Sequence, residues 1–75
     1  MHRPEGPKRA AFKRLAENRT NAILDKIRIL GNLANRSAYD YAEDDLRRIF
    51  SVIEDQLRET KSKFRAGDKR RFRLE

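Results

Sequence analysis

The sequence contains no cysteine and no tryptophan, and its single histidine, His2, adjoins the first residue. Without cysteine the chain can form neither a disulfide bond nor a thiolate metal site. A histidine beside a chain end is a poor metal ligand or general base, because chain ends are seldom held in place by a fold. No apolar run approaches the roughly 20 residues that a membrane-spanning helix needs. We therefore expect a soluble, cytoplasmic protein with no cofactor, no metal site and no membrane partner.

Motifs that carry catalytic chemistry are also missing. The sequence has no glycine-rich phosphate loop and no Gly-Lys-Ser/Thr triplet. Its three serines, Ser37, Ser51 and Ser62, have no histidine within the expected fold to act as their base. We therefore predict that the chain is not an enzyme.

Length and composition limit the fold to one small domain. The chain has 75 residues, 41% of them charged, and a net charge of +7. A chain of this size buries only about 60% of the surface that it exposes when unfolded, so its stability is marginal. We interpret residues 1–7 as a disordered leader, residues 8–66 as an all-α domain and residues 67–75 as a basic tail. The closing Leu74-Glu75 has the look of a cloning remnant, and no prediction rests on it.

Apolar residues recur every three or four positions from Phe12 to Ala34, apart from one wider step between Ala16 and Ala22, which predicts a first helix over about residues 8–34. Pro7 suits the first position of that helix, where its missing N–H would have no partner. Gly31 allows two alternatives for the C-terminal end of this helix. Either it caps the helix, or Leu33 and Ala34 continue it to about residue 35. We favour the continuous helix, weakened at Gly31 by about 1 kcal/mol.

A second helix is predicted over about residues 42–66. Three acids open it, where negative charge complements the helix dipole, and Gly67-Asp68 is a stop signal. Four acid–base pairs are spaced by four residues and are expected to form on its surface: Glu43–Arg47, Asp44–Arg48, Glu54–Arg58 and Glu59–Lys63. Its apolar face consists of Leu46, Ile49, Phe50, Ile53, Leu57 and Phe64, with Thr60 completing the spacing.

Residues 35–43 connect the two helices and contain Tyr39 and Tyr41. Alternate residues of an extended segment face the same side, so the two rings are expected to close the end of the helical pair like a lid. A pair of rings that stacks on a ligand is the alternative.

Two helices joined by a short connection pack antiparallel, which predicts a helical hairpin. Some apolar residues lie off the stripe that one partner helix would cover, namely Leu24, Ile29, Leu33 and Val52. A second copy of the chain would cover them and give a homodimeric four-helix bundle. A different protein could cover the same residues, which would make the chain an adaptor or regulator, and a stable monomer is the third possibility.

The excess positive charge lies at the two ends of the chain. Residues 1–14 have a net charge of +4 and residues 61–75 a net charge of +5, whereas residues 15–60 have −2. An antiparallel hairpin would bring both ends together into one cationic end. Cations at the start of the first helix oppose its dipole, at a cost of about 0.3–1 kcal/mol, so local stability does not explain them. This arrangement predicts a polyanionic partner, with RNA or DNA as the leading class and an acidic protein surface as the alternative.

One polar stripe of the first helix contains Arg14, Asn18, Asn21, Asp25, Arg28 and Asn32, and the first three of these residues adjoin the cationic end. Arginine and asparagine offer the paired hydrogen bonds that suit phosphates and base edges. The predicted nucleic-acid-binding residues are Lys8, Arg9, Lys13, Arg14, Asn18, Asn21, Lys69, Arg70, Arg71 and Arg73.

The central stretch, about residues 14–64, resembles small uncharacterised bacterial helical proteins. The resemblance is carried by Arg19, Asn21, Ile27-Arg28, Gly31-Asn32-Leu33, Asn35-Arg36, Tyr39-Asp40-Tyr41 and Ile49-Phe50. It implies no activity and no site. The expected architecture is also similar to that of small RNA-binding helical hairpins that dimerise, although a shared shape does not imply a shared function.

Overall fold

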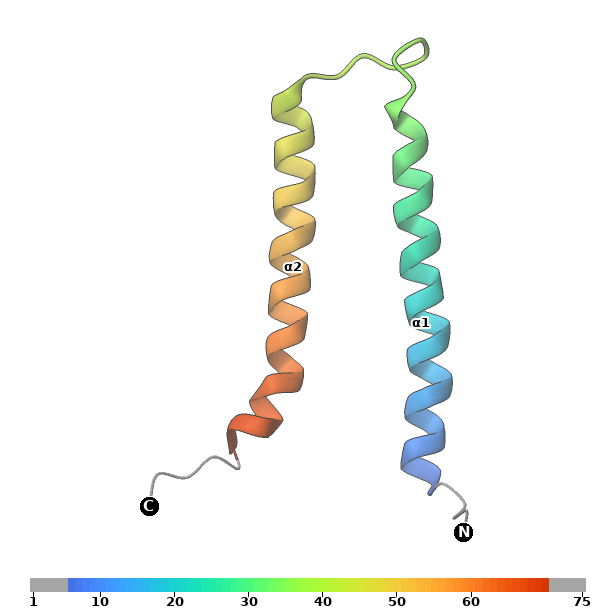
Figure 1. Cartoon of the computed structure of the whole chain (residues 1–75), viewed down its shortest axis with the longest axis vertical. Helices are drawn as coiled ribbons and strands as arrows, with labels where there is room; N and C mark the ends of the chain where they lie inside the picture. The colour runs from blue at the N-terminus through green and yellow to red at the C-terminus, as the bar shows by residue number, and fades with distance from the viewer. Residues whose placement is uncertain (1–5, 71–75) are drawn as a thin grey trace. The chain divides into compact units, whose positions relative to one another are not determined.

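The computed structural model describes residues 6–70, with side chains described for residues 6–65. It contains two α-helices, α1 (Pro7–Gly31) and α2 (Glu43–Arg70), and a short 3-10 helix, η1 (Asn32–Ala34), that follows α1 directly (Figure 1). The described chain has no strand, so the predicted all-α class is confirmed. The predictions for residues 1–5 and 71–75, which include Arg71 and Arg73, fall outside the described residues.

The first helix begins where the sequence predicts. Gly6 is its N-cap in an extended conformation, and Pro7 occupies the first helical position. The first backbone hydrogen bond runs from the Ala10 N–H to the Gly6 carbonyl oxygen, at 3.0 Å. No side chain that the structure describes caps this end, and the first turn of the helix contains no acid. Among the described residues, the start of α1 therefore depends on the backbone geometry of Gly6 and Pro7 and lacks the side-chain cap that many helices have.

The end of α1 combines features of both predicted alternatives. The α-helix ends at Gly31, but Gly31 keeps right-handed helical angles (φ −62°, ψ −22°) and is not a left-handed cap. The Asn32 N–H donates to the carbonyl oxygens of both Ile29 and Leu30, a sharing typical of helix ends that tighten. The backbone then continues as η1 to Ala34. The helical course thus reaches the predicted residue 34, with its last turn in the 3-10 form.

Asn35 organises the segment that follows η1. Its carbonyl oxygen accepts the N–H groups of Ala38 (3.1 Å) and Tyr39 (3.0 Å). Its side-chain Oδ1 accepts the N–H of Ser37 at 3.0 Å, which forms an asparagine-based turn. The chain divides into two units between Asp40 and Tyr41. The two tyrosines belong to different units, so the lid stays a prediction.

The start of α2 is capped by an acid three residues into the helix. The Ala42 N–H donates to Oδ2 of Asp45 at 2.9 Å, which is one half of a capping box. Glu43, Asp44 and Asp45 fill the first turn, as predicted. The Ala42 carbonyl oxygen accepts the N–H groups of Asp45 (3.0 Å) and Leu46 (3.3 Å). This end of α2 therefore has both the hydrogen bond and the negative charge that favour a helix start.

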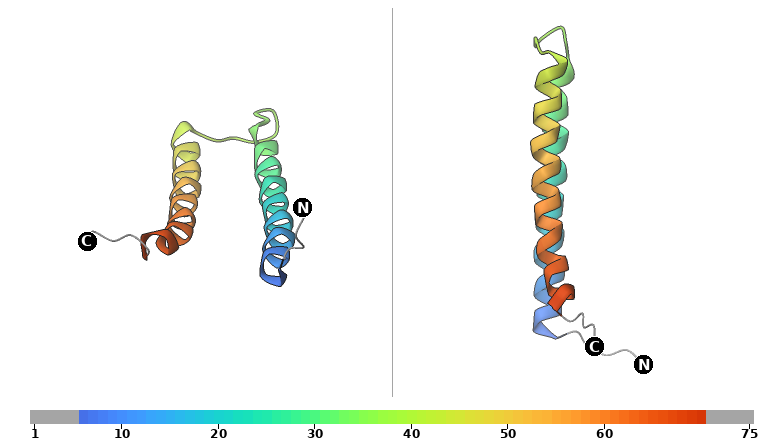
Figure 2. Two further views of the ribbon diagram at one scale, coloured as in Figure 1. Left: turned by 60° about the horizontal axis from the view of Figure 1, so that its bottom comes forward. Right: turned by 90° about the vertical axis from the view of Figure 1, so that its left-hand side faces the viewer.

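The predicted end of α2 at Ala66–Gly67 is wrong. The helix continues through Gly67 and Asp68 to Arg70, as the orange-to-red end of the ribbon shows in Figure 2. Glycine in a helix interior costs about 1 kcal/mol relative to alanine, but it keeps its N–H, so the hydrogen-bond ladder can pass through it. Lys69 and Arg70 consequently belong to the last turn of the helix and not to a separate tail.

The ion pairs on the helix surfaces use a different spacing from the predicted one. Arg47 pairs with Asp44 and Arg58 with Asp55, each at 2.8 Å and at a separation of three residues. The predicted partners were Glu43 and Glu54, four residues away. Aspartate has the shorter side chain, so its carboxylate stays close to its own turn and suits an arginine three residues later. The pairs are well exposed, and each contributes only a few tenths of a kcal/mol.

No side chain among residues 6–65 is buried. Large apolar side chains are exposed on both helices, for example Ile23 at 58% and Leu57 at 55%. In proteins, most of the stability of a helix comes from packing its apolar face and not from helix propensity. The apolar faces of α1 and α2 are therefore the surfaces whose packing would stabilise each helix.

Candidate polyanion-binding surface

Four cations surround the first two turns of α1. Lys8, Arg9, Lys13 and Arg14 are all exposed. At 100° per residue, Arg9 and Lys13 share one face, whereas Lys8 and Arg14 lie to either side of it. No acid that the structure describes forms an ion pair with Lys8, Arg9 or Arg14. The four residues form a cationic collar around the helix start, open to approach from several directions.

An aromatic ring lies within the collar. The Arg9 guanidinium carbon is 5.8 Å from the centre of the Phe12 ring, within the range of a cation–π contact. Phe12 is 51% exposed, although its spacing places it on the apolar stripe of α1. The contact covers part of the ring and holds the guanidinium close to the helix surface. It was not predicted from the sequence, although a three-residue separation of arginine and phenylalanine is its signal.

The polar stripe of α1 is only partly available for a ligand. Arg28 donates to Oδ1 of Asp25 at 2.6 Å, so its charge is already compensated. Arg14, Asn18 and Asn21 remain exposed on the part of the stripe that adjoins the collar. This part of the stripe therefore still offers hydrogen-bonding groups to a ligand.

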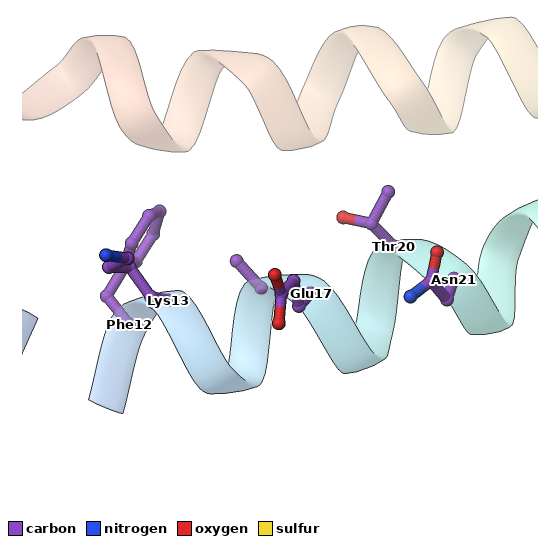
Figure 3. A pocket seen from close by; sticks show the side chains of 6 residues that line it. Phe12, Lys13, Glu17, Thr20 and Asn21 are labelled. Atoms are coloured by element: carbon purple, nitrogen blue, oxygen red, sulfur yellow. The ribbon is translucent and has the colours of Figure 1, made fainter. Parts of the chain in front are cut away.

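A shallow hollow runs along the same part of α1 (Figure 3). Its lining residues are Phe12, Lys13, Ala16, Glu17, Thr20 and Asn21. Small-molecule sites are enclosed and bury most of their ligand, and this hollow on a single helix is open. The surface therefore suits contact with an extended partner better than capture of a small molecule.

Two further cations interrupt the apolar face of α1. Arg19 and Lys26 follow Phe12 at successive steps of seven residues, so all three share one side of the helix. Both cations are exposed. Arg19 lies in the wider step between Ala16 and Ala22, and neither Arg19 nor Lys26 is among the predicted binding residues. The seven-residue repeat is the signal that would have found both cations.

The second cluster of cations lies at the other end of the sequence. Lys61, Lys63 and Arg65 are exposed on α2, and Lys69 and Arg70 follow in its last turn. The first three are absent from the predicted binding set, although they belong to the same basic stretch of sequence. The predicted meeting of this cluster with the collar stays a prediction.

Neither a metal centre nor a membrane span is found in the described residues. They contain no group of three or more histidine, cysteine, aspartate or glutamate side chains placed to hold a metal ion. Neither described helix combines the length and the apolarity that crossing a membrane requires. Comparison with protein-family models, with curated proteins and with solved structures finds no match.

Proposed function

We propose that the chain is a small non-enzymatic protein that binds a polyanion, nucleic acid in the first place, through its cationic end. The observation that carries this proposal is the contrast between the two helix starts. The first turn of α2 holds three acids, and that of α1 holds Lys8 and Arg9 with no acid. One chain thus follows the dipole rule at one helix and opposes it at the other. A charge arrangement that costs stability indicates a role in binding.

The proposal includes an architecture for the cationic end. The connection between η1 and α2 is eight residues long, over residues 35–42, and short connections favour antiparallel packing of helices. In such a hairpin, Lys69, Arg70, Arg71 and Arg73 would join the collar. Two hairpins would form a four-helix bundle in the cytoplasm, with one cationic end in each copy.

The chemistry of the proposed surface favours the nucleic-acid backbone over base edges. Lysine and arginine at a helix start approach phosphates from several directions and carry no sequence information. Arg14, Asn18 and Asn21 add hydrogen bonds along one stripe, which is a short surface for reading bases. We therefore infer binding without strong sequence selectivity.

A salt titration tests the proposal. Binding of the full chain to a mixed-sequence DNA or RNA duplex, followed by mobility shift, is expected to weaken by about a thousandfold between 50 and 200 mM salt, for about six phosphate contacts. The reason is that each neutralised phosphate releases counterions, which a high salt concentration opposes. Absence of binding at 50 mM salt, or an affinity that does not change with salt, would rule out nucleic acid as the partner.

An adaptor function is the second candidate, supported by exposed apolar residues off the main stripes. Ile29 is 56% exposed and Val52 67%. If a partner protein docks there, Ile29→Glu is expected to abolish capture of that partner and leave the helical circular-dichroism signal unchanged. Loss of the helical signal in Ile29→Glu would contradict this function, because it would make the face an ordinary part of the bundle core.

A further inference from the structure

The apolar stripe of α2 contains no charge, in contrast to that of α1. Its members are Leu46, Phe50, Ile53, Leu57, Thr60 and Phe64, at alternating steps of four and three residues. Phe50 is 47% exposed and Phe64 68%. Alternating steps of this kind form the seam along which helices pack side by side. The stripe is therefore a helix-packing surface about five turns long.

This stripe matches the same stripe on a second α2 that runs in the opposite direction. Its alternating steps read the same in both directions, so a second α2 that runs the opposite way, centred on residue 55, meets it position by position. Leu46 then lies opposite Phe64 of the second copy, Phe50 opposite Thr60, and Ile53 opposite Leu57. In the Leu46–Phe64 layer and in the Phe50–Thr60 layer, a phenylalanine meets a smaller side chain. A parallel pair would instead place each phenylalanine against its own copy and leave a gap at Thr60.

The charges of α2 favour the same direction. Residues 43–59 carry six acids and three arginines, whereas residues 60–65 carry Lys61, Lys63 and Arg65 and no acid. A parallel pair would bring the two basic segments together. In the antiparallel register, Glu43 shares a flank with Arg65 of the second copy, and Asp45 shares the other flank with Lys63.

Like-charged side chains meet at two kinds of position in this register. Glu54 lies on the same flank as Glu54 of the second copy, next to the centre of the pair. Arg47 comes opposite Lys61 of the second copy. Asp44 already holds the Arg47 guanidinium at 2.8 Å, which compensates its charge. Exposed flank pairs contribute little to stability, so the six layers of the stripe outweigh these unfavourable pairs.

We propose that α2 pairs antiparallel with the α2 of a second copy of this chain, in a register centred on Asp55. This inference rests on the dimer of the proposed function and specifies which helix forms the contact between the two copies. It does not depend on nucleic-acid binding. The seam of α1 is the weaker partner for this stripe, because Arg19 and Lys26 would lie against apolar side chains.

Spin labels on single introduced cysteines test the direction, since the sequence contains no other cysteine. In the antiparallel pair, labels at Ala42→Cys are separated along the axis by about 39 Å, and labels at Ser51→Cys by about 12 Å. A parallel pair would give nearly no axial separation at either position. Pulsed electron paramagnetic resonance on the full chain is expected to report a much longer distance for Ala42→Cys than for Ser51→Cys.

Two results would overturn this inference. The first is a distance for Ala42→Cys that is no longer than that for Ser51→Cys. The second is a monomer mass for the unlabelled wild-type chain in sedimentation, which would mean that α1 or another protein covers the stripe. A mobility shift on the same samples separates the proposals, because nucleic-acid binding by a monomer or by a parallel dimer would leave the polyanion function standing while this interface fails.

Discussion

Replacing Lys8, Arg9, Lys13 and Arg14 together by glutamine is expected to weaken binding to a nucleic-acid duplex by about a thousandfold at physiological salt. Each phosphate contact contributes about 0.9 to the slope of log K against log salt, so four lost contacts flatten that slope by between three and four. The measurement is a salt titration of the variant and the wild type on the same duplex. A slope that does not change would contradict the assignment of these residues to the binding surface.

The matched control removes the same amount of charge elsewhere. Glutamine at Arg28, Arg47, Arg48 and Arg58 also lowers the net charge from +7 by four. Three of these arginines are paired with aspartates in the structure. The control is expected to keep most of the wild-type slope. If both variants lose affinity equally, net charge alone drives binding and the collar has no special role.

The stability of the four-glutamine variant is expected to change in the opposite direction to its affinity. Lys8 and Arg9 lie in the first turn of α1, where positive charge opposes the helix dipole. Their neutralisation stabilises the helix by about 1 kcal/mol, which corresponds to a rise in Tm of about 4–8 °C for a domain of this size. A variant that binds less and melts higher cannot have lost its binding through unfolding.

Local patterns in the sequence were sufficient to predict most of the helical structure. The apolar spacing located both helices, Pro7 located the start of α1, and the acids at residues 43–45 located the start of α2. These features act within one or two helical turns, so they depend only on residues that are close in the sequence. The end of α2 was not predictable in the same way, because Gly67 lowers helix stability by an amount that the flanking turns can offset.

The candidate site was predictable in composition but not in arrangement. The collar residues follow from charge counting, whereas the contact of Arg9 with Phe12 and the pairing of Arg28 with Asp25 depend on side-chain rotamers. Both pairs have a three-residue spacing that many other pairs in the chain share. Sequence periodicity therefore lists the possible contacts of each cation, and the structure selects among them.

The second large effect is expected at Ile53, in the middle of the α2 stripe. Ile53→Asp places a charge in the proposed seam twice per dimer, once from each copy. Replacing a buried isoleucine even by alanine costs about 2–5 kcal/mol, and an unpaired charge costs more. The dimer is therefore expected to dissociate more than about 100-fold more readily, and the helical signal to fall with it, because an isolated helix has no covered apolar face. Sedimentation and circular dichroism at one protein concentration measure both effects.

Val52→Asp is the matched control for this substitution. Val52 precedes Ile53 in the same helix, so both changes cost similar helix propensity, but Val52 lies 100° away around the helix axis and is 67% exposed. It is expected to keep the wild-type mass and helical signal. If Val52→Asp dissociates the protein and Ile53→Asp does not, the dimer contact runs along the residues off the stripe, as in the first prediction from the sequence. Equal loss in both variants would mean that α2 is also covered on the face of Val52, which lies outside the register centred on Asp55.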